Sequence, residues 1–397
     1  MKALIIPEPT LFDLCGPGYA FNSRAPENAA DWVPHNPASA DAKTGNQLVI
    51  AGEMPVLCSA GSATGGGLAL LRDAGFQITA TPVTYRDPDD RYTQLVRFAE
   101  QGIIVIDQHV QPDASLRPGP TWIDSSLLSW LNNKGNLAEL VPVFCLPERI
   151  LCDPSLFDAE TLQQHALPLL IKVASDETSG GGLSVRLCHT ATDVARALAT
   201  FSGCERIVIE DYIPMAKNFC VNYAVAANGM VSYIGTTEQI IDAQCGYLGN
   251  WLGPDVAPPA ALIDAAGEIV ASAARLGYRG FAGMDAALTG DGSFYIYDLN
   301  FRFNGSTTPL LIHDAVARRA GLPSAEFRIW RYAGSFGDML RAARDLMDTG
   351  CFVPFGTFDP AAMGATGAAP TMAGLLLGES RDDIVEQRRR LKSAGLV

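Results

Sequence analysis

The sequence has few of the residues that build metal centres from nitrogen and sulfur ligands. Its five histidines are not paired at ligand spacing, and its nine cysteines, an odd number scattered from Cys15 to Cys351, contain no C-x-x-C pair. This pattern argues against a zinc site and against a disulfide framework. We therefore interpret the cysteines as reduced thiols and expect a cytoplasmic enzyme.

Basic residues and long apolar runs are also scarce. The chain has 29 Lys and Arg against 43 Asp and Glu, a formal net charge of −14, which argues against nucleic acid or an anionic membrane as the main partner. No stretch reaches the roughly 20 apolar residues of a membrane helix, and Pro7 interrupts the short apolar run at the N-terminus, so a signal peptide is not expected. A length of 397 residues predicts two or three domains, and a homodimer is the default for a soluble enzyme of this size.

The first 150 residues alternate short apolar runs with amphipathic segments. Apolar stretches within 47–60, 103–107 and 141–146 are typical of buried parallel strands, and Tyr92–Glu100 and Ser125–Leu131 are expected to be helices between them. We predict a Rossmann-like α/β domain over residues 1–150, with 22–46 as a long loop. The glycines at 61–67 do not form a dinucleotide fingerprint, so a dehydrogenase is not supported.

After residue 150 the pattern changes to mixed hairpins and helices, which predicts an α+β region. Thr190 and Asp193 resemble a capping box at a helix start, and Asn228-Gly229 is a strong hairpin signal. Strands are expected at 167–173, 183–188, 206–213, 219–226, 230–235, 281–288 and 294–302, and helices from 190, at 260–276 and at 308–320.

The hairpin of 281–288 and 294–302 concentrates polar groups. Read at a period of two, Tyr295, Tyr297, Leu299 and Phe301 form an apolar face, and the opposite face runs from Phe294 and Ile296 to Asp298, Asn300 and Arg302. The turn places Asp285 opposite Asp298 or one register away. Two carboxylates this close favour a shared proton or a divalent cation, and Mg²⁺ suits oxygen ligands of this kind.

A second polar feature is Lys172, at the end of an apolar strand and before a glycine-rich loop at 174–182. A lysine in a buried strand needs an anion, and glycines let backbone N–H groups approach phosphate oxygens closely. The loop is not a P-loop, and an ordinary glycine-rich hairpin loop explains it equally well.

The order of these features resembles the ATP-grasp superfamily over roughly residues 155–315. The resemblance implies ATP and Mg²⁺ as cofactors, and a nucleotide-binding and catalytic region over 151–340 with a C-terminal segment, 341–397, packed on it. It also implies roles for individual residues: phosphate contacts for Lys172 and the flap Ser179, Gly180, Gly181 and Gly182; adenine binding for Glu210 and the backbone of Tyr212 and Ile213; metal binding for Asp285, Asp298 and Asn300; and stabilisation of the transferred phosphate by Arg302.

The sequence departs from the family pattern in two places. Both metal acids are Asp where Glu is more usual, and the first nucleotide lysine of many members is not evident, with Arg149 as a guess for its substitute. The long N-terminal region and the tail at 351–378 resemble the branch with a pre-ATP-grasp domain, which includes the pheganomycin-type peptide ligases. That finer resemblance suggests peptide-bond formation in antibiotic biosynthesis.

The resemblance implies a ligase that phosphorylates a carboxylate to an acyl phosphate, which an amine then attacks with release of ADP and phosphate. A kinase on the same site and a non-catalytic ATP-binding regulator are the alternatives. Amino acids or peptides are the expected substrates. The remaining candidates are Asn218 and Asn222 for ribose, Thr236, Glu238 and Gln239 for the acceptor, the backbone of 304–306 for a carboxylate, a mobile wall at 242–259, and Cys220 and Cys245, which we interpret as buried thiols rather than nucleophiles.

Overall fold

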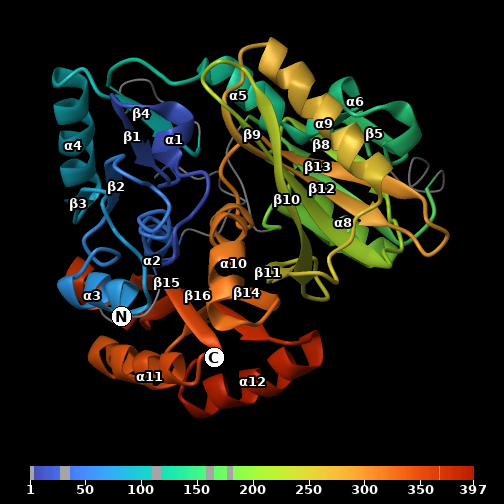
Figure 1. Cartoon of the computed structure of the whole chain (residues 1–397). Coiled ribbons are helices and arrows are strands. Elements are labelled where there is room, and N and C mark those ends of the chain that lie inside the picture. Colours follow the sequence, from blue (N-terminus) through green and yellow to red (C-terminus); the bar gives the residue numbers. More distant parts are fainter. Residues whose placement is uncertain (1–3, 27–35, 110–117, 158–164, 177–181, 366) are drawn as a thin grey trace.

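The computed structural model describes residues 4–26, 36–109, 118–157, 165–176, 182–365 and 367–397, and Figure 1 shows their arrangement around three sheets. No helix among these residues is long and apolar enough to cross a membrane.

The N-terminal sheet is parallel, with the strand order β3-β2-β1-β4. Its strands are β1 (Tyr19–Asn22), β2 (Val56–Ser59), β3 (Pro82–Tyr85) and β4 (Ile104–Asp107), and the helices of this region are α1 (Leu11–Cys15), α2 (Pro37–Ala42), α3 (Gly65–Asp73) and α4 (Pro88–Glu100). The predicted parallel sheet is therefore confirmed, although β1 was not anticipated and part of the expected loop at 22–46 is helix α2. Each strand is short, so few residues carry the apolar signal.

The central sheet has eight strands, all antiparallel, in the order β13-β12-β9-β10-β11-β14-β16-β15. The strands are β9 (Lys217–Val225), β10 (Val231–Ile241), β11 (Tyr247–Leu252), β12 (Gly280–Leu288), β13 (Phe294–Asn300), β14 (Ser324–Arg331), β15 (Phe352–Phe358) and β16 (Thr371–Gly378). Helices that pack on it include α9 (Ala260–Arg275), α10 (Thr307–Ala320), α11 (Phe336–Asp348) and α12 (Arg381–Ser393), together with α3 of the N-terminal region.

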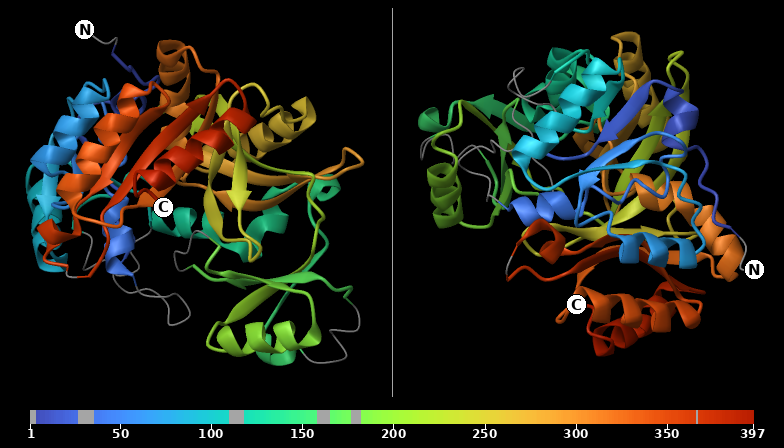
Figure 2. Two further views of the ribbon diagram at one scale, coloured as in Figure 1. Left: turned by 90° about the horizontal axis from the view of Figure 1, so that it is seen from below. Right: turned by 90° about the vertical axis from the view of Figure 1, so that its left-hand side faces the viewer.

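A smaller antiparallel sheet of the order β5-β8-β6-β7 forms a separate lobe that projects from the rest, as the green segment in the left panel of Figure 2 shows. It consists of β5 (Arg149–Cys152), β6 (Leu169–Ala174), β7 (Val185–Cys188), β8 (Arg206–Asp211) and helix α8 (Ala191–Thr200). The predicted capping box at Thr190 and Asp193 begins α8.

Two expectations are wrong. Residues 141–146 are not a strand but contain the short 3₁₀ turn Val143–Cys145, with Val143 and Phe144 exposed, because Pro142 cannot donate to a sheet ladder. The segment 242–259 is not one loop, since it contains β11 in the middle of the central sheet.

A shared apolar core joins the N-terminal and central sheets, whereas the small lobe has a core of its own. The shared core joins the N-terminal sheet to the β14–β16 half of the central sheet, through residues such as Phe21, Phe327 and Phe355. A second lies between α9 and strands β9, β12 and β13, and a third lies under α11 and α12. The domain boundaries at 150 and 340 stay predictions, and the first of them falls inside β5.

Candidate active site

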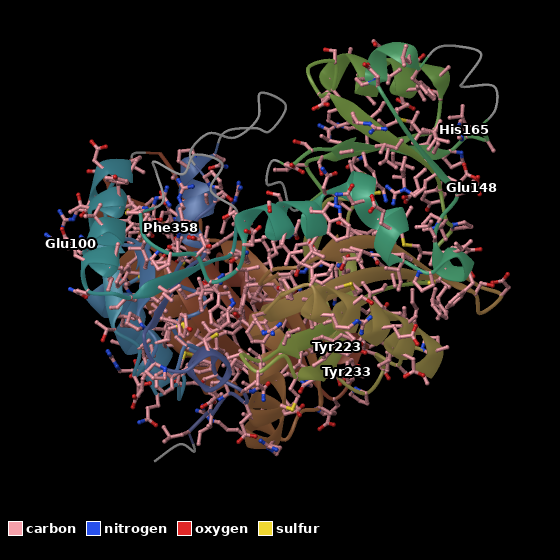
Figure 3. All side chains as sticks on the ribbon, turned by 90° about the horizontal axis from the view of Figure 1, so that it is seen from above. Glu100, Glu148, His165, Tyr223, Tyr233 and Phe358 are labelled. Carbon is pink, nitrogen blue, oxygen red and sulfur yellow. The ribbon has the colours of Figure 1, made fainter. Side chains whose placement is uncertain are left out.

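A cavity of about 1020 Å³ lies where the three sheets meet. Its lining comes from the ends of β1 and β4, from β6 and β8 of the small lobe, and from β9, β12, β13 and β14 of the central sheet. Phe358 lines the cavity near the N-terminal sheet, and Figure 3 shows it on the opposite side of the molecule from Glu148 and His165 of the small lobe. Residues distant in sequence are therefore brought to one place.

The two predicted carboxylates face each other across a hairpin. Asp285 in β12 is the cross-strand partner of Asp298 in β13, as the turn arithmetic predicts. The register shifts directly beyond this pair, so that Ala286 pairs with Ile296 and Tyr297 is the extra residue of a β-bulge.

The bulge corrects the predicted faces of β13. Ile296, Leu299 and Phe301 belong to the same apolar core, while Tyr297 lines the cavity instead of packing with Leu299. The Tyr297 hydroxyl donates to Asn218 Oδ1 at 2.6 Å. The extra residue thus reverses the alternation and leaves Tyr297 and Asp298 on the cavity side together.

Asp285 is almost completely buried and carries two hydrogen bonds. Gln239 Nε2 donates to its Oδ1 at 2.7 Å, and Asn300 Nδ2 donates to its Oδ2 at 3.0 Å. Burial and the charge of Asp298 raise the pKa of Asp285 to about 6. Ionisation of both carboxylates is therefore unfavourable, which is the property expected of a pair that shares a cation.

A lysine that the sequence analysis missed completes this arrangement. Lys134, in the 3₁₀ turn Lys134–Asn136, donates from Nζ to Asp298 Oδ1 at 2.5 Å. Burial acts to raise the pKa of Asp298, but the charge and hydrogen bond of Lys134 outweigh it, so this pKa lies below its ordinary value. No motif around Lys134 indicates this role in the sequence, because its partner Asp298 is 164 positions away.

The phosphate-binding candidate Lys172 also lies in the cavity wall. Its Nζ donates to Glu210 Oε1 and to the backbone oxygen of Tyr297 at 3.1 Å. Glu210 is completely buried, and its Oε2 lies 3.7 Å from Arg149 Nη1 across the β5–β8 pair. Arg149 thus faces Glu210, whereas Lys134 reaches the carboxylate hairpin itself.

The candidates for binding adenine (Tyr212, Ile213), ribose (Asn218) and phosphate (Gly182) lie at the small-lobe end of the cavity. Tyr212, Ile213, Asn218 and Gly182 all line it, together with the apolar side chains of Leu170, Met215 and Ala287. Glu210 lines it too, but its carboxylate is engaged by Lys172. The flap residues Ser179, Gly180 and Gly181 lie outside the described residues.

Arg302 enters the same cavity from the chain just after β13. Its Nη1 donates to Asn132 Oδ1 at 2.8 Å, and Asn132 also receives the backbone N–H of Phe301. The following residues 304–306 line the cavity at the start of α10, where Ser306 N donates to Asn304 Oδ1 at 2.8 Å. The structure therefore brings Lys172, Asp285, Asp298, Asn300 and Arg302 into one cavity.

Several other candidates do not reach it. Asn222 is buried against Asn304 and is not part of the cavity lining. Glu238 points to the other side of β10, where Arg381 binds it through two contacts of 2.6 and 3.1 Å. Of the three acceptor candidates only Gln239 belongs to the cavity lining. The Thr236 hydroxyl instead contacts the hydroxyl of Tyr233. The Tyr233 ring lies 5.5 Å from that of Tyr223, and Figure 3 shows this pair.

Cys220 lies beside the carboxylates but is not suited to act as a nucleophile. It is the cross-strand partner of Asp285 on β9 and is buried. Burial and the charge of Asp285 raise the pKa of its thiol well above the ordinary value. Cys245 also has a raised pKa through burial, so both thiols are held protonated.

Family models match both halves of this arrangement. A model described as the L-aspartate–L-methionine ligase N-terminal domain matches residues 10–129, and one described as the ATP-grasp domain of the same ligase matches residues 147–300. The chain belongs to the ATP-grasp superfamily. It is an ATP-dependent carboxylate–amine ligase, so the kinase and regulator alternatives are not favoured.

Solved structures of ATP-grasp enzymes share the fold. An N5-carboxyaminoimidazole ribonucleotide synthetase in complex with ADP has a TM-score of 0.62 and 14% identity, with 99% of this chain and 98% of that chain covered. The corresponding enzyme from Thermus thermophilus has a TM-score of 0.60 and 14% identity over 94% and 98% of the two chains. An L-amino acid ligase from Bacillus licheniformis has a TM-score of 0.53 and 12% identity over 95% and 98%.

These matches refine the sequence analysis in one respect. The family models that match are those of the L-aspartate–L-methionine ligase, whereas the comparison with pheganomycin-type ligases, and with it antibiotic biosynthesis, stays a prediction.

Proposed function

We propose that this ATP-grasp ligase joins two amino acids into a dipeptide, with an acidic amino acid as the carboxyl donor and an apolar one as the amine. L-Aspartate and L-methionine are the pair named by the matching family models. The observation that carries the proposal is that those two models cover the N-terminal sheet and the catalytic hairpin, the two regions whose residues meet in the cavity.

The cavity lining supports this pair of substrates. Leu248 and Ile329 line it although each is 42% exposed, and they leave an apolar surface open for the side chain of an amine substrate. Lys43 lines the N-terminal side of the cavity and suits a negatively charged donor, whereas the charge of Arg24 in the same lining is already met by Asp41.

ATP is assigned to the end of the cavity near the small lobe. Its adenine would lie between Leu170, Ile213 and Met215, against the backbone that follows β8. Its phosphates would lie toward Lys172 and Lys134, which both line the cavity. Lys134 rather than Arg149 is our candidate for the missing nucleotide lysine, because Lys134 contacts Asp298 while Arg149 is turned to Glu210.

Asp285, Asp298 and Asn300 would hold Mg²⁺. Three observations support the fit of these residues to a divalent cation. The two carboxylates lie opposite each other, and the charge of Asp298 together with burial raises the pKa of Asp285. In addition, a cation, the Lys134 ammonium, already contacts Asp298. Mg²⁺ typically binds proteins through only one or two carboxylates. When bound, Mg²⁺ supplies positive charge that neutralises the phosphate oxygens.

The reaction needs two steps. A carboxylate oxygen of the donor attacks the γ-phosphorus of ATP, the bond to the β-phosphate oxygen breaks, and ADP leaves. Arg302, whose guanidinium is fixed by Asn132, is placed to stabilise the moving phosphoryl group. The deprotonated amine of the second amino acid then attacks the acyl carbon, the bond to phosphate breaks, and an amide and inorganic phosphate are formed.

The test is phosphate release by the purified protein with MgATP and a panel of amino acids, followed by mass spectrometry. ADP and phosphate together with a condensation product of the aspartate and methionine masses minus water are the expected result. Formation of AMP, or of a phosphorylated amino acid as the final product, would overturn the mechanism. Phosphate release with a different pair of amino acids would keep the ligase and replace the substrates.

A further inference from the structure

Helix α10 begins at the cavity, beside the carboxylate hairpin. It starts five positions after Arg302, and residues 302–306 all belong to the cavity lining. Asn304 packs on β12 at Gly283, where a Cβ atom would collide with its side-chain amide. Gly283 lies two positions before Asp285 in the same strand, so both face the same side of the sheet, about 7 Å apart. Direct contacts therefore place the start of α10 next to Asp285.

The first turn of α10 keeps backbone N–H groups available for a ligand. A helix cannot satisfy its first N–H groups by itself, and together they attract anions. Ser306 N donates to Asn304 Oδ1 at 2.8 Å, and Thr307 N donates to the backbone oxygen of Asn304 at 3.2 Å. The N–H groups of Gly305 and Thr308 donate to no described residue. Two backbone donors thus remain at the start of a helix of 14 residues.

The Thr308 side chain adds a hydroxyl whose hydrogen bond the protein does not supply. Thr308 is 3% exposed and belongs to the cavity lining, and its hydroxyl makes no hydrogen bond with any described residue. A buried hydroxyl without a partner costs free energy, so folded proteins keep few of them. Because Thr308 lies in the cavity wall, a bound ligand can provide the missing partner.

Tyr247 on β11 brings a second hydroxyl to the same place. A Cβ atom on Gly305 would lie 2.5 Å from Tyr247 Oη, so this oxygen lies directly against the start of α10. Asn250 Nδ2 donates to Tyr247 Oη at 2.6 Å, whereas the Tyr247 proton is donated to no described residue. Burial, and then the neighbouring Cys220 and Asp285, raise the pKa of Tyr247 well above its ordinary value, so the hydroxyl keeps this proton.

We propose that the start of α10 and the hydroxyls of Tyr247 and Thr308 bind the α-carboxylate of the amine substrate, and so restrict that substrate to amino acids with a free carboxylate. This inference rests on the proposed function. Two backbone N–H groups and two hydroxyls can all donate to one anion, and hydrogen bonds to an ionised acceptor are stronger than those to a neutral one.

The neighbouring apolar wall identifies the carboxylate as that of the amine substrate. Leu248 follows Tyr247 directly and lines the cavity together with Ile329. Gly249 pairs with Arg328 in antiparallel strands, so Leu248 and Ile329, one position further along, lie next to each other. An amino acid carries its carboxylate and its side chain on one carbon atom. The carboxylate site must therefore adjoin the side-chain site, as Tyr247 does.

Two other groups could accept the same hydrogen bonds. One is a carboxylate of the donor amino acid, and the other is the oxyanion that forms on the acyl carbon when the amine attacks. Both belong to the donor, so neither is lost when the amine substrate is replaced by one without a carboxylate. This difference is the basis of the experiment.

The experiment compares L-methionine with 3-(methylthio)propylamine, which is the same amine without the carboxylate, at saturating ATP and L-aspartate. The measured quantity is the ratio of the two kcat/KM values in the full-length protein. We expect Tyr247→Phe and Thr308→Val each to lower this ratio about tenfold or more, because each removes a hydrogen bond to a charged group. Thr308→Ser keeps the hydroxyl and should restore most of the ratio.

Tyr233→Phe and Thr357→Val are the matched controls. The Tyr233 hydroxyl contacts Thr236, and Tyr233 is not part of the cavity lining. The Thr357 hydroxyl is buried without a partner among the described residues, like that of Thr308, but Thr357 does not line the cavity. Both controls should keep the wild-type ratio.

Three results would overturn the subsite. An equal loss for both amines in Tyr247→Phe and Thr308→Val would mean that the hydroxyls act on the acyl group. A changed preference between L-aspartate and L-asparagine, with the amine ratio unchanged, would assign the carboxylate to the donor. An unchanged ratio with no other effect would leave the two hydroxyls without a role in binding.

Failure of the proposed function gives a different result. If the wild-type protein does not condense aspartate with methionine, or does not use the amine without a carboxylate, both amines are titrated calorimetrically with ADP and MgCl₂ present. Binding of methionine that Tyr247→Phe and Thr308→Val weaken about tenfold, and that Thr357→Val does not weaken, supports the subsite without turnover. Absence of methionine binding to the wild-type protein, or equal affinity in all variants, overturns it.

Discussion

Asp285 and Asp298 lie directly opposite each other in β12 and β13, and the Lys134 ammonium contacts the second of them. Each carboxylate has different neighbours, since Gln239 and Asn300 donate to Asp285. Burial and the charge of Asp298 raise the pKa of Asp285, whereas the charge and hydrogen bond of Lys134 outweigh burial and lower the pKa of Asp298. One hairpin thus carries two chemically distinct carboxylates.

We predict that Asp298→Asn abolishes ligation while the fold is retained. The change removes a proposed metal ligand and the partner of Lys134 but fills the same volume. Phosphate release should fall by at least about 100-fold, which is the loss typical of removing one electrostatic contact in a transition state. The melting temperature should change by only a few degrees.

The matched control for this prediction is Asp291→Asn in the turn of the same hairpin. Asp291 accepts hydrogen bonds from Thr289 and from the backbone of Ser293, far from the cavity lining. It should keep wild-type turnover. A large fall in melting temperature for Asp298→Asn with activity retained would show that this carboxylate is structural.

Lys134→Gln should weaken both nucleotide binding and turnover. The substitution removes the cation that contacts Asp298 and that we place beside the phosphates. We expect a rise of about tenfold or more in the KM for ATP, because a charge-assisted contact is lost. Lys392→Gln, an exposed lysine on α12, is the control. An unchanged KM for ATP in Lys134→Gln would contradict this role of Lys134, and Arg149 would then be the candidate for the basic residue that contacts the nucleotide.

The carboxylate hairpin could be predicted because its information is local. A two-strand hairpin with a short turn limits which residues face each other, so spacing alone predicts Asp285 opposite Asp298 or one register away, and the structure shows the first of these. The bulge at Tyr297 has no such signal, since it depends on how the extra residue fits its neighbours. This is why Tyr297 was assigned to the core and lies instead in the cavity.

Other parts of the site depend on contacts between distant segments. Lys134, Lys43 and His109 lie in three separate segments that only the packing of the lobes brings together, and none has a motif of its own. Likewise, the sequence predicts a loop where β11 lies, because Gly249 and Asn250 interrupt its apolar pattern. The strand forms because β10 and β14 pair with it on both sides.

The neutral state of His109 gives a pH dependence of stability. Burial and three nearby cations lower its pKa to about 3, whereas the unfolded chain has a histidine pKa near 6.5. Between these values the unfolded state binds more protons, so the free energy of unfolding should rise with pH from about 3 to 6.5 and level off above it. Urea unfolding at several pH values in this window measures the slope.

His109→Gln should flatten that slope, because glutamine takes no proton in either state. His189→Gln removes an exposed histidine before α8 and should leave the slope as it is in the wild-type protein. Equal slopes in the wild-type protein and in His109→Gln would mean that other groups, chiefly carboxylates, account for the whole pH dependence.

Glu326 and Arg388 provide a test of stability that is independent of the site. Glu326 in β14 is completely buried, and Arg388 on α12 contacts it through two hydrogen bonds of 2.6 Å, with Arg328 as its second partner. Since side chains alternate along a strand, Phe327 and Ile329 face the cavity while Glu326 and Arg328 face α12. Damage to this ion pair should therefore affect folding and not the chemistry.

We predict that Arg388→Ala lowers the free energy of unfolding by about 2 kcal/mol, because it leaves a buried carboxylate with only one of its two cations. Urea unfolding measures this loss, and kcat at a temperature well below the transition should stay within about twofold of the wild-type value. Arg389→Ala removes an exposed partner of Glu386 one position further along α12 and should cost less than about 0.5 kcal/mol. If Arg388→Ala instead lowered kcat without changing stability, α12 would have to be coupled to the cavity through β14, and the separation of the two faces of that strand would be wrong.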